Sequence, residues 1–174
     1  MEQIEKIRHS LAHLLASAVT EFFPKVKLAI GPAIENGFYY DIEIPGGLTH
    51  GDLPKIEARM RELIKENQAF IGKKVTKLAA KKLFKHSPYK LELIKDLPGK
   101  TVGTYQNGNL LDLCKGGHIK NTEEIDPQAF KLTKLAGAYW KGNEKNKMLT
   151  RIYGVAFNTA KELQDYLKMQ AEAE

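Results

Sequence analysis

The sequence is short of cysteine and has no long apolar stretch. Cys114 is the single cysteine among 174 residues, so the chain cannot form an internal disulfide, and this content fits a reducing compartment. No apolar run approaches the roughly 20 residues that a membrane span needs. The N-terminus has neither the basic start nor the apolar core of a signal peptide. We therefore expect a cytoplasmic protein with no membrane partner.

Acidic residues are missing from one segment, between Gly72 and Lys90. The segment holds seven lysines, which is more positive charge than the net +6 of the whole chain. They are Lys73, Lys74, Lys77, Lys81, Lys82, Lys85 and Lys90. Concentrated positive charge favours an anionic partner, and phosphate binding fits this segment as well as a solvated lysine-rich face does.

No internal repeat or low-complexity linker interrupts the chain, and its length and 43% hydrophobic content suffice for one domain with a buried core. Apolar residues at spacings of three and four predict a helix over 4–23, which Pro24 ends. A second helix is expected to start at Asp52, as its N-cap, with Pro54 in the first turn. A final helix is expected from Thr159.

Asn-Gly dipeptides between apolar runs predict two hairpins, at Asn36-Gly37 and at Asn107-Gly108. The lysine-rich segment should hold one short strand and one or two short helices. Further strands are predicted over 130–140 and 148–157. Because strands come in hairpins and do not alternate with helices, we predict the α+β class, with a largely antiparallel sheet packed against the long N-terminal helix and further helices.

Two histidines lie one turn apart on the first predicted helix. His9 and His13 are four residues apart, so both imidazoles project from one face. That face lies about 160–200° from the centre of the apolar stripe, and its other residues are the small Ala12, Ala16 and Thr20. Such a pair is more often solvated or part of a satisfied core, but a face of small residues also fits the wall of a cleft.

Cys114 and His118 form a second pair, and the glycines between them let the backbone turn tightly. Asp112, two residues before the cysteine on a predicted strand, points to the same side. A lone cysteine can be a small buried hydrophobe, yet thiol and imidazole also titrate near neutrality and serve proton transfer. Both groups are preferred zinc ligands. Four such ligands make a structural zinc site, and three ligands with a bound water make a catalytic one. Either chemistry remains open for the two pairs.

Longer blocks of sequence surround these pairs: RHSLAHLL at 8–15, Gly31-Pro32, NGFYYD at 36–41, DLCKGGH at 112–118, LAGAYW at 135–140 and RIYG at 151–154. In this order they resemble the editing domain of bacterial-type threonyl-tRNA synthetase. The last two blocks are similar to a segment that threonyl and alanyl editing domains share, and Tyr-Trp after Ala-Gly-Ala points to the threonyl branch. The resemblance covers nearly the whole chain.

The resemblance implies roles for particular residues. The pocket in which an ester bond is cut would be lined by His9, His13, Cys114 and His118. Water and substrate would be positioned by Lys90 and Asp112. The terminal adenosine or the serine would be contacted by Tyr40 and Tyr105, with Asp41 supporting Tyr40 and the backbone of Gly116 and Gly117 close by. Ordinary packing of the tyrosines and a surface position of Lys90 are the plainer readings.

The sequence departs from the family's pattern in two ways. Gly117 stands where the family usually has proline, so a looser loop is expected. The chain begins at the editing domain and ends where the synthetase core would start, so we expect either an excised part or a freestanding editing protein, unable to aminoacylate. Residues 1–158 would form the editing domain, with its site between the 4–23 helix and the 102–118 strand and loop. Residues 159–174 would form the C-terminal helix that leads to the core.

The implied function is post-transfer editing, the hydrolysis of seryl-tRNA(Thr). A missing methyl is worth only about 1–3 kcal/mol of discrimination, so a synthetic pocket for threonine admits serine and a second pocket must remove it. Water would attack the seryl carbonyl, His9 or His13 would take its proton, and N–H groups around Gly116-Gly117, or Lys90, would stabilise the oxyanion.

The expected partners are the acceptor end of tRNA(Thr) carrying serine, held through phosphates by the lysines from Lys73 to Lys85, and the remainder of the synthetase. No cofactor is required for this reading. Two alternatives stay open. One is a zinc-dependent freestanding deacylase of the alanyl type, with zinc on the two His and Cys pairs. The other is a tRNA-binding module without catalysis.

Overall fold

Two antiparallel sheets and five α-helices make up residues 1–173, the part that this computed structural model describes. The helices are α1 (Gln3–Phe22), α2 (Leu53–Lys65), α3 (Lys77–Leu83), α4 (Pro88–Asp96) and α5 (Ala160–Ala173). The larger sheet has the order β1 (Lys27–Leu28), β3 (Gly37–Glu43), β8 (Met148–Ala156) and β7 (Phe130–Tyr139), with β2 (Ala33–Ile34) also pairing with β3. The smaller sheet has the order β4 (Ile71–Thr76), β5 (Thr101–Asn107) and β6 (Leu110–Leu113). The predicted α+β class is confirmed.

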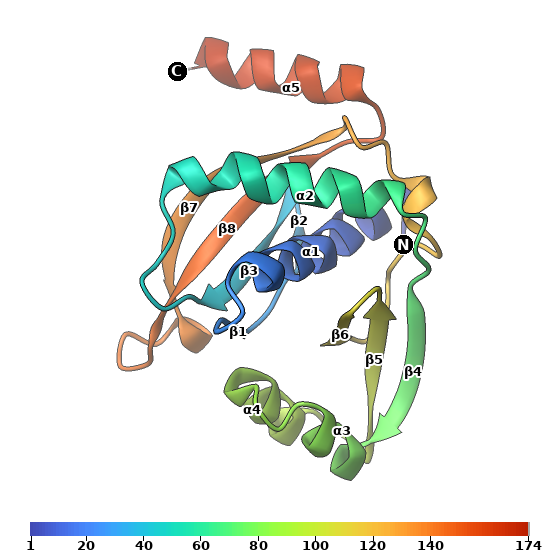
Figure 1. Ribbon diagram of the computed structural model, residues 1–174, viewed down its shortest axis with the longest axis vertical. Helices are drawn as coiled ribbons and strands as arrows, with labels where there is room; N and C mark the ends of the chain where they lie inside the picture. Colours follow the sequence, from blue (N-terminus) through green and yellow to red (C-terminus); the bar gives the residue numbers. More distant parts are fainter. Residues whose placement is uncertain (174) are drawn as a thin grey trace.

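Helix α1 lies at the centre of the molecule, with the small sheet, α3 and α4 below it in Figure 1. It packs against α2 and against strands β2, β3 and β8 of the large sheet. Every residue from Ser10 to Val19 is buried, so the helix is covered on all sides and not along one stripe. Ala12 and Ala16, expected on a cleft wall, belong to this core. The cleft is restricted to the surroundings of the two histidines.

Helix α2 begins where the sequence predicts, with Asp52 at the N-cap position and Pro54 in the first turn. The Asp52 carboxylate does not cap α2, however, because it accepts a hydrogen bond from the Thr49 N–H at 2.9 Å and closes the short 3-10 turn before the helix. Ile56, Met60 and the other buried positions of α2 face α1 and the large sheet, which fixes the core behind the site.

Both predicted hairpins are present. Asn36 has a φ of 64° in the turn before β3, and Asn107 pairs with Leu110 so that the second turn is Gly108-Asn109. The lysine-rich segment forms β4, α3 and the start of α4, as expected. One face of the small sheet packs on α3 and α4 through Val75, Val102 and their neighbours.

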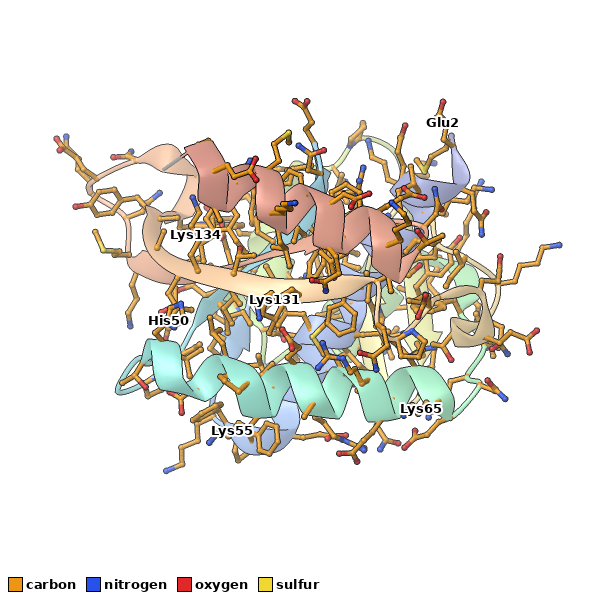
Figure 2. The ribbon with its side chains drawn as sticks, turned by 90° about the horizontal axis from the view of Figure 1, so that it is seen from above. Glu2, His50, Lys55, Lys65, Lys131 and Lys134 are labelled. Atoms are coloured by element: carbon orange, nitrogen blue, oxygen red, sulfur yellow. The ribbon has the colours of Figure 1, made fainter. Side chains whose placement is uncertain are left out.

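Helix α5 lies across the large sheet from α2, with Lys131 and Lys134 of β7 between them in Figure 2. It contacts the rest of the chain through buried Leu163 and through Tyr166, whose ring lies 5.0 Å from that of Phe157. Among residues 1–173, no helix is both long and apolar enough to cross a bilayer.

Candidate active site

The two His and Cys pairs meet around one cavity of about 430 Å³, which we call the His–Cys cavity. Helix α1 supplies His9 and His13, and the loop after β6 supplies Cys114 and His118. Lys90 enters from the first turn of α4, and Asp112 from β6. The opposite wall is Ile30, Gly31, Pro32 and Leu93. A cavity of this size is in the range of small-ligand sites.

The imidazoles and the thiol are in direct contact. Cys114 Sγ lies 3.2 Å from His9 Nε2, and the ring centroids of His9 and His118 are 4.2 Å apart in a stacked arrangement. The His13 ring is edge-on to His118 at 5.9 Å. Among the described residues, neither ring nitrogen of buried His13 has a hydrogen-bond partner. Buried polar groups are nearly always paired, so the two unpaired nitrogens of His13, a residue that lines the cavity, need an explanation.

The loop between Cys114 and His118 has a backbone that favours glycine. Gly116 and Gly117 have φ angles of 132° and 89°. Proline is fixed near about −65°, so a proline at position 117 would exclude this path. Within residues 1–173, the N–H groups of positions 115–118 donate no hydrogen bond, whereas those of Cys114 and Ile119 on either side do. Unpaired N–H groups in a glycine turn form a concavity that suits an anion.

A buried ion pair closes the inner end of the cavity. Lys90 Nζ lies 2.6 Å from Asp112 Oδ1 and donates to the Ala29 carbonyl at 2.6 Å and to the Tyr40 hydroxyl at 2.9 Å. The Tyr40 hydroxyl in turn donates to Asp112 Oδ2 at 2.8 Å. These contacts use all three hydrogens of the ammonium group. Lys90 is therefore a buried residue with a fixed orientation and not a surface lysine.

Burial sets the charge state of the site. Desolvation lowers the pKa of His9 and of His13, and lowers that of His118 to about 3 with the help of the two neighbouring imidazoles. Burial likewise raises the pKa of the Cys114 thiol. Burial opposes ionisation of Asp112 too, but Lys90 and His13 hold its pKa below the ordinary value. At neutral pH the site thus has neutral imidazoles, a neutral thiol and a charged Lys90–Asp112 pair.

Three of the four expected zinc donors are close enough to share one ion. The ligand atoms of His9, Cys114 and His118 all lie within 4.8 Å of one another, while His13 is outside this group. The closed four-donor arrangement is therefore not formed. Two imidazoles and a thiol with room for a further ligand are the donor set of a catalytic zinc site.

Tyr40 and Asp41 have other surroundings than expected, whereas Tyr105 lies where it was expected. Tyr40 is 1% exposed and lies behind Asp112, outside the residues that line the cavity. Tyr105 does reach the site, with its ring 4.2 Å from that of His118. Asp41 is on the other side of β3 from Tyr40, because strand residues alternate, and its carboxylate binds Arg151 at 2.7 and 2.9 Å. Tyr40 is supported by Asp112 and Lys90 instead.

The expected phosphate-binding lysines are also divided. Lys73 and Lys74 on β4 are exposed near the site, and Lys81, Lys82 and Lys85 are exposed on or just after α3. Lys77 is partly buried and donates to the Leu97 carbonyl.

Ser10 is a functional residue that the sequence reasoning missed. It is buried between the two histidines, and its hydroxyl accepts the Ile119 N–H at 3.0 Å, which ties α1 to the loop carrying His118. Lys115, which also lines the cavity, was missed as well. Its place directly after Cys114 was the available signal.

Comparison with known proteins shows which proteins the chain resembles. The family described as threonyl and alanyl tRNA synthetase second additional domain matches residues 102–153. Threonine–tRNA ligase of Borrelia hermsii is 51% identical over 168 residues, which are 96% of this chain and 29% of that protein. That of Dehalococcoides mccartyi is 50% identical over 173 residues, which are 99% of this chain and 29% of that protein. Over nearly its whole length, the chain is similar to one part of these threonine–tRNA ligases.

These matches confirm the resemblance to the threonyl branch that the sequence blocks carry. The family segment begins at β5 and ends in β8, so it includes Asp112, Cys114 and His118 but not the histidines of α1. The longer similarity to the ligases includes α1 as well. The chain spans less than a third of the length of these relatives, 29% in each case.

Proposed function

We propose that this chain is the editing domain of a threonyl-tRNA synthetase and hydrolyses the ester bond of seryl-tRNA(Thr), releasing serine and tRNA. The observation that carries the proposal is the meeting of His9, His13, Cys114 and His118 in one cavity beside a buried Lys90–Asp112 pair. A domain that only bound RNA would have no need to gather six titratable groups around an empty volume.

We propose His13 as the general base. Its lowered pKa keeps the imidazole neutral at pH 7, and both ring nitrogens lack partners within residues 1–173. His9 is less suited because its Nε2 already faces Cys114 Sγ. A water held between His13 and the seryl carbonyl would lose its proton to the imidazole as it attacks, and the leaving 3′ oxygen of the ribose would then be protonated.

The negative charge that develops on the carbonyl oxygen needs hydrogen-bond donors. Lys90 has no free hydrogen to offer, because Ala29, Tyr40 and Asp112 take all three. The unpaired N–H groups of residues 115–118 are therefore the better candidates, in the manner of an oxyanion hole. Lys90 contributes its charge and, together with Asp112, a fixed wall.

Deacylation of seryl-tRNA(Thr) compared with threonyl-tRNA(Thr) tests the proposal, with the chain alone or within a full-length synthetase. Seryl-tRNA should be hydrolysed and threonyl-tRNA spared. His13→Ala should reduce the rate by roughly 10²- to 10⁴-fold, the usual contribution of a general base. His50→Ala is the matched control, since His50 is exposed outside the cavity. Intact seryl-tRNA in the presence of folded wild-type protein would leave a tRNA-binding module as the function.

A zinc-dependent variant is the second candidate, and the three-donor cluster favours it. His9, Cys114 and His118 would hold the ion, and zinc would supply a Lewis acid and an activated water. Metal analysis of protein purified without chelator or added zinc separates the two candidates. One equivalent of zinc that is lost in Cys114→Ser supports the variant, and metal-free protein with full activity excludes it.

We further propose that residues 1–158 form the editing unit and that 159–174 lead to the rest of a synthetase in the cytoplasm. Helix α5 contacts the rest of the chain through Leu163 and Tyr166, and this limited contact supports a connecting role. The single cysteine supports a reducing compartment such as the cytoplasm.

A further inference from the structure

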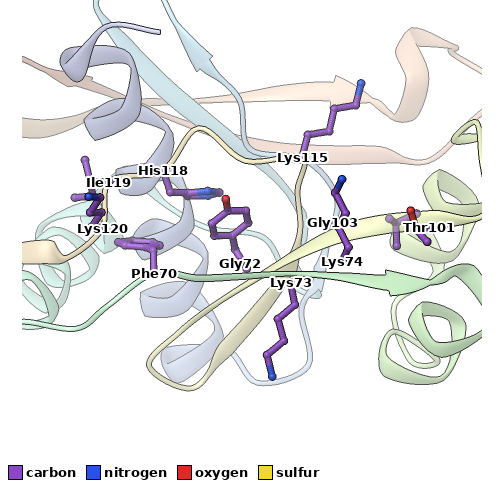
Figure 3. Close-up of a pocket in the computed structure, with 12 residues that line it drawn as sticks. Phe70, Gly72, Lys73, Lys74, Thr101, Gly103, Lys115, His118, Ile119 and Lys120 are labelled. Carbon is purple, nitrogen blue, oxygen red and sulfur yellow. The ribbon is translucent and has the colours of Figure 1, made fainter.

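A second concavity, of about 640 Å³, adjoins the His–Cys cavity. It lies beside β4, β5 and the loop after β6, and we call it the lysine-lined hollow. Figure 3 shows Phe70 and His118 at one end of it and Thr101 at the other. His118 and Lys115 line the hollow as well as the His–Cys cavity, so the two spaces meet at these side chains. The hollow is therefore next to the candidate site.

The floor of the hollow is a strip of glycine backbone with one aromatic ring. Gly72 pairs with Tyr105 across β4 and β5, and Gly103 pairs with Lys74. A Cβ at Gly72 would lie 2.7 Å from the Tyr105 ring, so the glycine lets this ring lie across the neighbouring strand. The ring then continues to His118, 4.2 Å away, which in turn stacks on His9. His118 thus lies between the ring of Tyr105, which lines the hollow, and the ring of His9, which lines the His–Cys cavity.

The rim of the hollow is basic. Its lysines are Lys73, Lys74, Lys115 and Lys120, all exposed. No aspartate or glutamate lines the hollow, and within residues 1–173 none of the four ammonium groups is within ion-pairing distance of a carboxylate. Lys74 lies on the same face of the sheet as Gly72, Gly103 and Tyr105, whereas Lys73 points to the opposite face, as Figure 3 shows. The charge that a polyanion on the floor would meet therefore comes from Lys74, Lys115 and Lys120.

We infer that the lysine-lined hollow binds the single-stranded nucleotides that precede the terminal nucleoside of the tRNA, while that nucleoside and its ester occupy the His–Cys cavity. Aromatic rings with flanking lysines are the usual means of holding single-stranded nucleic acid. The inference rests on the proposed function for the placement of the ester. The inference treats the lysines of the hollow separately from those of α3, because α3 packs on the opposite face of the small sheet.

The test compares two substrates of the chain, seryl-tRNA(Thr) and a serine ester of adenosine alone, which has no preceding phosphate. The variant is Lys74→Ala combined with Lys120→Ala, two residues that line the hollow but not the His–Cys cavity. The control combines Lys65→Ala with Lys168→Ala, which removes the same charge from two exposed sites elsewhere.

The hollow variant should raise KM for seryl-tRNA on the order of tenfold, with kcat unchanged, and should reduce the slope of log affinity against log salt by about 1.4, or 0.7 for each lost contact. Hydrolysis of the adenosine ester should be the same in wild type, variant and control. Equal KM and slope in the variant and the control would overturn the inference, and so would an equal loss on both substrates.

Binding of a short single-stranded RNA that ends in adenosine keeps this inference distinguishable from the proposed function. If the wild type cleaves neither substrate, the proposed function fails. The hollow is still tested by whether the Lys74→Ala and Lys120→Ala double variant weakens RNA binding beyond the control. Unchanged RNA binding would overturn the inference.

Discussion

His13 is the residue whose surroundings are hardest to explain by packing alone. It is 2% exposed, and both ring nitrogens are unpaired within the described chain. Leaving a buried polar group unpaired costs about 1–3 kcal/mol. Ser10, one turn earlier, shows that the same helix can pair a buried polar group, because its hydroxyl both donates to Lys6 and accepts from Ile119. Packing alone therefore does not account for the unpaired imidazole of His13, and the proposed role as a base would.

The Lys90–Asp112 pair leads to a prediction about stability. Lys90→Met should lower the free energy of unfolding by about 3–5 kcal/mol, because it leaves the Asp112 carboxylate buried without its partner. Asp112→Leu should cost a similar amount for the converse reason. The double variant should lose less than the sum of the two, since no uncompensated charge remains.

Urea unfolding of the wild type and the three variants measures these free energies. Additive losses would show that the two charges do not interact across their 2.6 Å contact. Hydrolysis should stay low in the double variant even where stability returns, because the charge beside the scissile bond is gone.

The sequence predicted which histidines and cysteine lie together but only part of what supports them. Helical spacing places His9 beside His13, and the glycine turn places Cys114 beside His118. The contact of Tyr40 with Asp112 joins residues 72 positions apart, and no local pattern contains it. Asp41 and Tyr40 are neighbours on one strand, so alternation already places their side chains on opposite faces. The expectation that Asp41 supports Tyr40 did not take this into account.

At the scale of elements, a glutamate joins the first turn of α1 to the loop that follows His118. The Glu124 carboxylate accepts from the Gln3 side chain at 2.8 Å and from the Lys120 and Asn121 N–H groups at 2.9 and 3.2 Å. Burial works against its ionisation, but these hydrogen bonds hold its pKa below the ordinary value. Glu124 thereby links the start of α1, the helix that carries His9, to the segment that follows His118.

Glu124→Ala should lower the free energy of unfolding by about 1 kcal/mol at pH 7, the usual value of a lost cap. A depressed pKa stabilises the folded chain above the pKa of the unfolded state, and this contribution is lost as pH falls through the folded value. The difference between variant and wild type should therefore shrink from pH 5 to pH 3.

Urea unfolding at several pH values measures the difference. Glu123→Ala is the control, because Glu123 is exposed and its carboxylate has no hydrogen bond within residues 1–173. A Glu124→Ala difference that stays constant down to pH 3 would contradict the role of the charge.

Local sequence patterns predicted the helices and strands better than they predicted how deeply these elements are buried. Turn dipeptides and apolar periods gave the hairpins, α1, α2 and β7–β8 close to their observed bounds. The burial of residues 10–19 on all sides could not be predicted, because it depends on elements distant in sequence, including the loop whose Ile119 N–H reaches Ser10 from 109 positions away. One sequence block typical of the family, 135–140, also proved to be a support. Trp140 contacts Tyr89 and Glu92 of α4, which carries Lys90.

At the scale of the whole molecule, less positive charge is available to RNA than the composition suggests. Lys90 is neutralised by Asp112, and Lys77 is held by a backbone carbonyl. The remaining lysines of the segment fall on two sides of the small sheet, since α3 and α4 cover the face opposite the lysine-lined hollow. RNA that reaches both sides must pass around an edge of this sheet.

This division predicts how salt affects tRNA binding. If the acceptor-stem duplex lies on α3, replacing Lys81, Lys82 and Lys85 with alanine should reduce the slope of log affinity against log salt by about 2.7, or 0.9 for each phosphate contact. Hydrolysis of the serine ester of adenosine should not change, because that substrate lacks the duplex. Titration of tRNA between 50 and 300 mM salt, on the order of the physiological range, measures the slope. An unchanged slope would mean that these three lysines are a solvated face, and the stem would then have to approach from the side of the hollow, where Lys74, Lys115 and Lys120 supply the remaining charge.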